Sequence, residues 1–120
     1  QQNLIGEMKK RPEMCITFIA YVNDEPAGIA NCIVGFSSFA CKSLLNIHDF
    51  TTIPKFRRMG VAKQLLQFVE DYARDKDMCK VTLEVLENNL PAKMAYLQHG
   101  FKPFELRPQD GAALFFQKYV

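Results

Sequence analysis

The chain has 120 residues, 48% of them hydrophobic, and a formal net charge of +2 at pH 7. This length suits one domain with a single core, and the apolar fraction excludes a disordered chain. The small net charge argues against nucleic-acid binding, because a surface that tracks phosphates usually makes the whole domain strongly basic. No apolar run approaches the roughly 20 residues of a membrane span, and no signal core is seen at the start. We therefore expect a single soluble, cytoplasmic domain over residues 1–120 that binds neither nucleic acid nor membrane.

The first half of the chain predicts a helix end followed by strands. Residues 3–10 are interpreted as the end of a helix that Pro12 stops. Apolar runs rich in Ile, Val, Phe and Tyr follow, and strands are expected at residues 15–22, 27–36 and 44–53. The turn-forming sequence Asn-Asp-Glu-Pro separates the first two runs, which favours an antiparallel hairpin.

The second half changes to helical spacing at Val61. Apolar residues then recur every three or four positions for about four turns. The alternating sequence VTLEVL at residues 81–86 predicts the next strand, and strand, helix and strand in this order form a βαβ unit with two parallel strands. A second helix is expected from Asn88 or Asn89, acting as its cap, to Gly100.

Two closing strands are expected at residues 101–106 and 113–120, joined by a loop that contains Pro108, Asp110 and Gly111. No internal repeat or linker divides the chain. The elements together predict one α/β domain with a mixed sheet.

The four cysteines stand singly in mostly apolar surroundings, at Cys15, Cys32, Cys41 and Cys79. No CxxC pair or histidine gives them the spacing of a zinc site or a redox motif. They are expected to be buried free thiols, and no metal site is expected.

A glycine and several basic residues stand just before the first full helix, in the sequence IPKFRRMGVAKQLLQF of residues 53–68. The first turn of a helix leaves backbone N–H groups without partners and carries a partial positive charge. Gly60 lets the backbone approach a ligand closely, while Arg57, Arg58 and Lys63 offer charge-assisted bonds to phosphate. We interpret the stretch as a phosphate-binding site, with a solvated helix start as the alternative. It is neither a P-loop nor a GxGxxG fingerprint.

Two stretches resemble a known family. Residues 57–62, Arg-Arg-Met-Gly-Val-Ala, resemble the Arg/Gln-x-x-Gly-x-Gly/Ala signature of the GNAT superfamily of acyl-CoA-dependent N-acyltransferases. Residues 89–101 resemble its Asn-x-x-Ala-x-x-x-Tyr-x-x-x-Gly-Phe element. The resemblance covers about residues 15–120 and implies an α+β fold with a mixed, mostly antiparallel sheet, a central βαβ unit and flanking helices. The family's first strand and most of its first two helices have no counterpart in this sequence. We therefore expect either a fragment of a longer chain or a second chain that supplies them.

The resemblance implies that acetyl-CoA is the co-substrate and that no metal takes part. The pyrophosphate is expected on the backbone N–H groups at the start of the helix. The pantetheine arm is expected along the third strand of this chain, with an asparagine of the second element on its other side. The cofactor-binding residues implied in this way are Phe50, Thr52, Arg57, Arg58, Met59, Gly60, Val61, Ala62, Lys63 and Asn89.

The reaction implied is direct attack of a neutral primary amine on the acetyl thioester in a ternary complex. It needs a base for the amine proton, donors for the oxyanion and an acid for the leaving thiolate. By resemblance, Tyr96 is the acid; the alternative is an amphipathic core tyrosine. The family has no single invariant base. His48, a residue type that exchanges protons near neutral pH, and Glu84, on the exposed side of VTLEVL, are candidates beside a chain of waters.

The sequence leaves the amine acceptor open. A small molecule, an amino-acid amino group and a protein N-terminus or lysine all fit this chemistry. The competing hypothesis from another class is a non-catalytic module that binds acyl-CoA or is regulated by it. A homodimer through an exposed edge strand near the C-terminus is also considered, because such edges pair readily.

Overall fold

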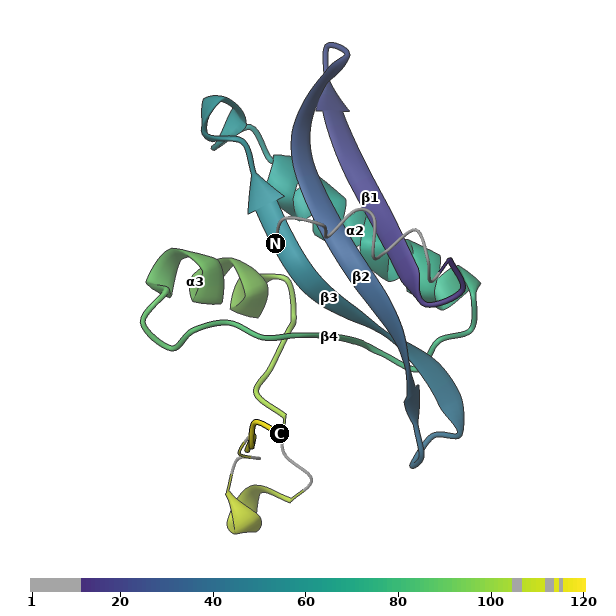
Figure 1. Ribbon diagram of the computed structural model, residues 1–120. Helices are drawn as coiled ribbons and strands as arrows, with labels where there is room; N and C mark the ends of the chain where they lie inside the picture. Colours follow the sequence, from purple (N-terminus) through teal and green to yellow (C-terminus); the bar gives the residue numbers. More distant parts are fainter. Residues whose placement is uncertain (1–11, 105–106, 112–113, 115) are drawn as a thin grey trace. The chain divides into compact units, whose positions relative to one another are not determined.

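The computed structural model describes residues 12–104, 107–111, 114 and 116–120 (Figure 1). The chain divides into two compact units, Gln1–Val85 and Leu86–Val120. The helix end expected at residues 3–10 lies outside the described residues. None of the helices in the described part of the chain combines the length and the hydropathy that a bilayer crossing requires.

The first unit is built on a four-stranded sheet in the order β1-β2-β3-β4. β1 (Cys15–Val22), β2 (Glu25–Ser37) and β3 (Lys42–Thr52) form an antiparallel meander. β4 (Val81–Leu83) then pairs with β3 in parallel. The predicted hairpin, the βαβ unit and the mixed sheet with mainly antiparallel pairs are therefore confirmed.

The turn between β1 and β2 shows why the hairpin forms where it does. Asn23 and Asp24 have φ angles of 48° and 67°. A two-residue turn with both residues in the left-handed region matches the twist of antiparallel strands, and Asn and Asp tolerate this conformation better than most residues. The turn sets Val22 opposite Glu25 and Tyr21 opposite Pro26, and the register then shifts once, between Tyr21 and Ala20.

Helix α2 (Val61–Asp75) lies across one face of the sheet (Figure 1). Phe18 of β1 contacts two aromatic rings of the helix edge to face, with centroid distances of 5.6 Å to Phe68 and 5.2 Å to Tyr72. Alternate residues of the strands and one stripe of the helix meet in the core, as their sequence spacing predicts. The buried apolar residues are Phe18, Ala27, Ala30, Cys32, Leu45, Ile47, Phe56, Val61, Leu65, Leu66, Val69 and Ala73.

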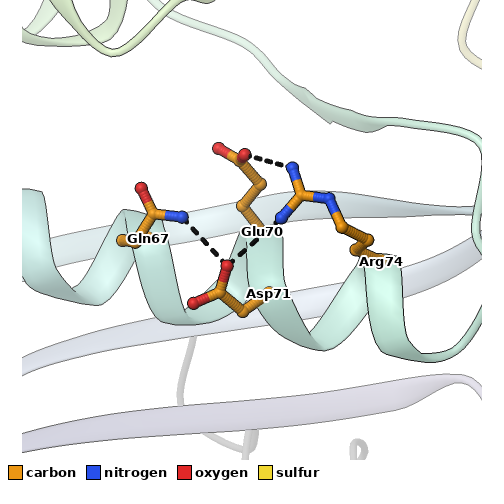
Figure 2. Close-up of polar contacts among 4 residues, drawn as sticks. All are labelled: Gln67, Glu70, Asp71 and Arg74. Carbon is orange, nitrogen blue, oxygen red and sulfur yellow. Dashed lines mark hydrogen bonds and ion pairs between the residues drawn. The ribbon is translucent and has the colours of Figure 1, made fainter.

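The exposed side of α2 carries a network of polar side chains (Figure 2). Arg74 binds Glu70 at 2.6 Å and Asp71 at 3.2 Å, and Gln67 donates to Asp71 at 2.9 Å. The hydrogen bond to Glu70 is the main reason that the pKa of Arg74 is raised. Exposed pairs three or four positions apart support a helix only slightly, so burial against the sheet holds α2 in place.

The expectation of four buried thiols is wrong for two of them, and a third, Cys15, is only half-buried. Cys32 is buried in the core, and burial raises the pKa of its thiol to about 12. Cys41, in the turn after β2, and Cys79, in the bend before β4, are both exposed. Both stand where the chain reverses direction, and an apolar neighbourhood in sequence does not bury a side chain there.

The second unit contains α3 (Leu90–Gln98) and the short 3-10 helix η2 (Pro108–Asp110). Asn89 is the N-cap of α3, and its Oδ1 accepts from the backbone N–H of Ala92 at 3.4 Å. The helix ends before Gly100, whose φ of 98° is favourable only for glycine. The predicted cap and stop of this helix are therefore confirmed.

The prediction of two closing strands is wrong for those of their residues that the structure describes. Residues 101–104, 114 and 116–120 form no strand, and the remaining residues of both runs lie outside the described part. Pro103 cannot donate a ladder hydrogen bond, and Phe116 and Tyr119 are 85% and 88% exposed, so no buried face supports a strand there. β4 is also shorter than predicted and ends at Leu83 instead of Leu86, because its pairing with β3 ends there.

Candidate active site

The first turn of α2 begins without a capping side chain. Gly60 occupies the N-cap position at φ 78° and ψ 11°, and none of the described residues caps the helix or places an acidic group in its first turn. The backbone N–H groups of residues 61–63 consequently lack the partner that a Ser, Thr or Asp cap supplies. This helix end is suited to accept an anion.

The segment ahead of Gly60 is anchored to the sheet. The 3-10 helix η1 (Pro54–Phe56) follows β3, and the buried ring of Phe56 packs with Ala27 of β2 and Val61 of α2. The N–H of Ile53 donates to the carbonyl of Ala27 at 2.8 Å. The start of α2 is thus held on β2 by an apolar contact and by a backbone hydrogen bond a few residues earlier.

Three exposed basic side chains surround this helix start: Arg57, Arg58 and Lys63. Among the described residues, none of the three side chains forms a hydrogen bond or an ion pair, whereas the neighbouring Lys55 binds Glu25 at 3.1 Å. Arg58 also has a φ of 67°, an unusual conformation for a residue with a long side chain. The positive charge at the helix start is therefore available to a ligand.

β3 and β4 separate several residues before β3 reaches this helix start. Their parallel pairing ends with Ile47 opposite Leu83, whereas β3 continues to Thr52 in its pairing with β2. The register with β2 passes from Asn31↔Asp49 to Cys32↔Ile47 and so skips His48, which marks a β-bulge. Bulges are common beside active sites, where they end a pairing or turn a side chain.

Gly28 shows that the end of β3 and the start of α2 lie side by side. It is the register partner of Thr52, and a Cβ atom on Gly28 would lie 3.1 Å from Cγ1 of Val61. The helix start therefore packs directly on the strand next to Thr52. An extended ligand with a phosphate at one end can contact the helix start and continue along β3.

The two candidate bases come immediately after the last parallel pair. His48 follows Ile47 on β3, Glu84 follows Leu83 on β4, and both side chains are exposed. The structure thus brings them to the same level of the sheet, where the strands separate. Glu84 lies beyond the end of β4, so its predicted place on an alternating strand face is wrong, although its exposure is confirmed.

Tyr96 and Asn89 belong to the second unit. Tyr96 is half-buried on α3, its ring contacts Phe101 edge to face at 6.0 Å, and burial raises the pKa of its phenol. The neutral phenol is therefore favoured at neutral pH, as an acid requires. Asn89 uses its Oδ1 to cap α3, which leaves its amide N–H groups as donors.

Sequence reasoning missed a hydrogen-bonded pair of polar residues, Thr17 on β1 and Asn31 on β2. Asn31 is 6% exposed and accepts a hydrogen bond from Oγ1 of Thr17 at 2.8 Å. The available signal was one asparagine inside an otherwise apolar strand. Among the described residues, no three or more His, Cys, Asp or Glu side chains are arranged to hold a metal ion.

The comparison with family models decides the family. Residues 2–101 match the model described as the acetyltransferase (GNAT) family. The chain belongs to this family. Both motifs of the GNAT resemblance fall within the matched residues.

Two curated relatives of this GNAT chain are N-acetyltransferases by name. The chain is 34% identical over 79 residues to the thialysine N-epsilon-acetyltransferase of Caenorhabditis elegans, which covers 66% of this chain and 49% of that protein. It is 26% identical over 96 residues to an uncharacterized N-acetyltransferase of Archaeoglobus fulgidus, covering 79% of this chain and 63% of that protein. The GNAT chain thus spans about half the length of the first relative and 63% of the second.

Solved structures share the fold of this GNAT chain. A probable acetyltransferase superposes with a TM-score of 0.78 at 21% identity, over 97% of this chain and 77% of that one. The aminoglycoside acetyltransferase AAC(6')-Iy, in complex with a bisubstrate analogue of coenzyme A, superposes with a TM-score of 0.75 at 21% identity. This superposition covers 98% of this chain and 78% of that one. At this identity the likeness establishes the GNAT fold, and the α+β architecture expected from the motifs is confirmed.

Proposed function

We propose that this chain forms the acetyl-CoA-binding and catalytic part of an N-acetyltransferase that acts on the primary amine of a small molecule. The observation that carries the proposal is the start of α2, which has no capping side chain and is surrounded by three basic side chains without partners among the described residues. The separation of β3 from β4 after Ile47 supports the same function, because it leaves the last residues of β3 without β4 as a neighbour and so available to an extended arm. Residues 1–120 act as one domain in this proposal.

The cofactor sites follow from these features. The pyrophosphate binds the backbone N–H groups of residues 61–63, with Arg57 and Arg58 as charged partners. The pantetheine arm runs along β3 between Phe50 and Thr52. The motif resemblance, and not the structure, assigns Asn89 as a further cofactor-binding residue. Met59 lies inside the loop that shapes this binding site.

The chemical step needs one proton acceptor and one proton donor. The neutral amine attacks the carbonyl carbon of the acetyl thioester, the C–N bond forms, and the C–S bond breaks as the tetrahedral intermediate collapses. The proton of the amine passes to His48 or Glu84, which stand together where β3 and β4 separate. As the motif resemblance implies, Tyr96 gives its phenol proton to the sulfur of coenzyme A.

The names of the relatives support a small-molecule amine as the acceptor. One curated relative is named for the ε-amine of thialysine. Structural neighbours are named for aminoglycosides, and one of them was crystallised with a bisubstrate analogue in which coenzyme A is joined to an aminoglycoside. Direct transfer between two bound substrates agrees with such an analogue, which occupies both sites at once.

The test is a calorimetric titration with acetyl-CoA of the wild-type chain and of two variants at Gly60. A Cβ atom at Gly60 meets nothing within 4 Å, so Gly60→Asp and Gly60→Asn differ from each other only in charge and share the same backbone strain. We expect one-to-one binding by the wild-type chain, and an affinity about tenfold lower for the aspartate variant than for the asparagine variant.

Equal affinities of the two variants, or no binding by the wild-type chain, would contradict the site. Binding of acetyl-CoA without transfer to any amine in a screen would instead favour the non-catalytic module. Variants at the two candidate bases, His48→Gln and Glu84→Gln, separate their roles. The true base is the residue whose loss removes the acidic limb of the kcat/KM pH profile.

A further inference from the structure

Three polar residues form a row across the sheet. Thr17 on β1 is the register partner of Asn31 on β2, which is in turn the register partner of Asp49 on β3. Directly opposed residues of antiparallel strands point to the same face, and their Cβ atoms lie about 5 Å apart. The three side chains therefore stand next to one another, and we call them the polar row.

The polar row lies on the face of the sheet opposite α2. A Cβ atom on Gly28 would touch Val61 and Leu65 of the helix, so Gly28 faces α2. Successive residues of a strand alternate between faces, and Asn31 is three positions away from Gly28. This face is not part of the core beneath the helix.

Two groups of the polar row lack a hydrogen-bond partner in the described residues. Asn31 is 6% exposed, and its Oδ1 accepts from Thr17, but its Nδ2 has no partner there. Asp49 is half-buried, and its carboxylate makes neither a hydrogen bond nor an ion pair with any described residue. None of the fully buried side-chain nitrogen or oxygen atoms of the described residues lacks a partner, so Nδ2 of Asn31 keeps some contact with solvent. The half-buried carboxylate of Asp49 and this amide donor are therefore both available to a ligand.

Apolar side chains flank the polar row on the same face. Ile19 and Ile29 form the neighbouring register pair on one side, and Ile33, two positions after Asn31 and beyond the register shift, lies on the other. Ile19 is 45% exposed, so this surface is open to a ligand along β1. A carboxylate between aliphatic side chains suits an ammonium group at the end of a methylene chain.

The polar row ends beside the proposed chemistry. Asp49 directly follows His48, the residue of the bulge, at the level where β3 leaves β4. We propose that the polar row binds a second cationic group of the amine acceptor, with Asp49 as the counter-ion and Asn31 as a further polar contact. The acceptor class is then an aliphatic amine that carries another ammonium group. This inference deepens the proposed function and rests on it for the position of the reacting amine.

The test compares 1,5-diaminopentane with 1-aminopentane, which have the same carbon chain and differ in one terminal ammonium group. Each is titrated calorimetrically into the chain, with and without coenzyme A. We expect the diamine to bind at least about tenfold more tightly to the wild-type chain. Asp49→Asn should abolish this difference, while Asp75→Asn, a matched change at the exposed end of α2, should leave it unchanged.

A second readout locates the bound diamine. In ¹H–¹⁵N spectra, the side-chain amide signals of Asn31 should shift on titration with the diamine and much less with the monoamine. This measurement needs only the wild-type chain, so it decides the question even where Asp49→Asn does not fold. The amine titrations involve no acetyl transfer, and a failure of acetyl-CoA binding is therefore recorded separately from a failure of the polar row.

Equal affinities of the two amines for the wild-type chain would overturn the inference. A preference that persists in Asp49→Asn would overturn it as well, because the carboxylate would then not be the counter-ion. Absence of binding by either amine would also overturn it, and would favour another segment of protein as the cover of this face.

Discussion

The side chain of Asn46 on β3 donates through Nδ2 to Oγ1 of Thr82 on β4, at 2.9 Å. The two residues are register partners, and the parallel pairing ends with the next pair, Ile47 and Leu83. The bond therefore ties the two strands together immediately before they separate. It stabilises the point from which the proposed site for the pantetheine arm opens.

Thr82→Val is expected to weaken this attachment. The variant keeps the shape of the side chain but leaves Nδ2 of Asn46 with only the carbonyl of Thr82, at 3.5 Å. We expect the free energy of unfolding to fall by about 1 kcal/mol in urea titrations and the affinity for acetyl-CoA to fall severalfold. Ser37→Ala removes an exposed hydrogen bond in the turn after β2 and serves as the control. An unchanged affinity in the valine variant would show that the bond has no influence on the site.

Gly28→Ala is expected to disturb the start of α2. The new Cβ would lie 3.1 Å from Val61 of the helix, closer than nearly all natural contacts. The helix start must move away by a few tenths of an ångström, so we expect acetyl-CoA to bind about tenfold more weakly. Gly35→Ala is the matched control, because its Cβ would also meet an atom at 3.1 Å, but on the side chain of Leu44 away from the helix. Equal affinities of the two variants, measured by calorimetry, would argue against a site at the helix start.

Arg58→Gly separates stability from ligand binding. Arg58 has a φ of 67°, which costs an ordinary residue on the order of 1 kcal/mol and costs glycine little. The variant should unfold at the same or a higher urea concentration, yet bind acetyl-CoA more weakly because it has lost a positive charge. Asn23→Gly relieves a similar conformation, at a φ of 48°, in the turn before β2. This control should bind acetyl-CoA with the affinity of the wild-type chain. If Arg58→Gly also kept that affinity, Arg58 would not be part of the binding site.

Tyr96→Phe tests the proposed acid. If the phenol protonates the leaving thiolate, kcat should fall about 100-fold while the KM for acetyl-CoA changes little. The exposed Tyr119 provides the matched control, since Tyr119→Phe should preserve activity. Full turnover in the Tyr96 variant would leave the tyrosine as a packing residue of α3.

The same variant has an expected effect on stability at alkaline pH. Burial raises the pKa of Tyr96 above its usual 10.0. Between pH 10 and the raised pKa, the unfolded chain has lost the phenol proton that the folded chain still holds, so the unfolded state binds fewer protons. The contribution of Tyr96 to stability is therefore complete below pH 10 and falls as the pH rises further. Urea titrations between pH 9 and 11 should show that the free energy of unfolding falls less with rising pH for Tyr96→Phe than for the wild-type chain.

Local signals in the sequence were sufficient to predict most of the helices and strands. The apolar run at residues 15–22 predicted β1 to the residue, because its alternation and the Asn-Asp turn are short-range features. The helix at α2 was predicted from Val61 because glycine, a change of period and a long amphipathic stripe coincide there. Runs with weaker patterns, such as residues 101–106, were assigned as strands although the described part of that run forms none.

By itself, the sequence determined the family, the helix start that forms the proposed anion site, and the residues that motif spacing singles out there. It could do so because the conformation of a glycine, the end of a helix and a sequence motif all depend on neighbours along the chain. Only the tertiary structure decided that β3 and β4 separate after Ile47, that His48 and Glu84 leave the pairing together, and that Thr17, Asn31 and Asp49 form a row. These relationships join residues that are 14 to 36 positions apart. They depend on strand register and on a bulge, which are set by the packing of the whole sheet and not by any local run of residues.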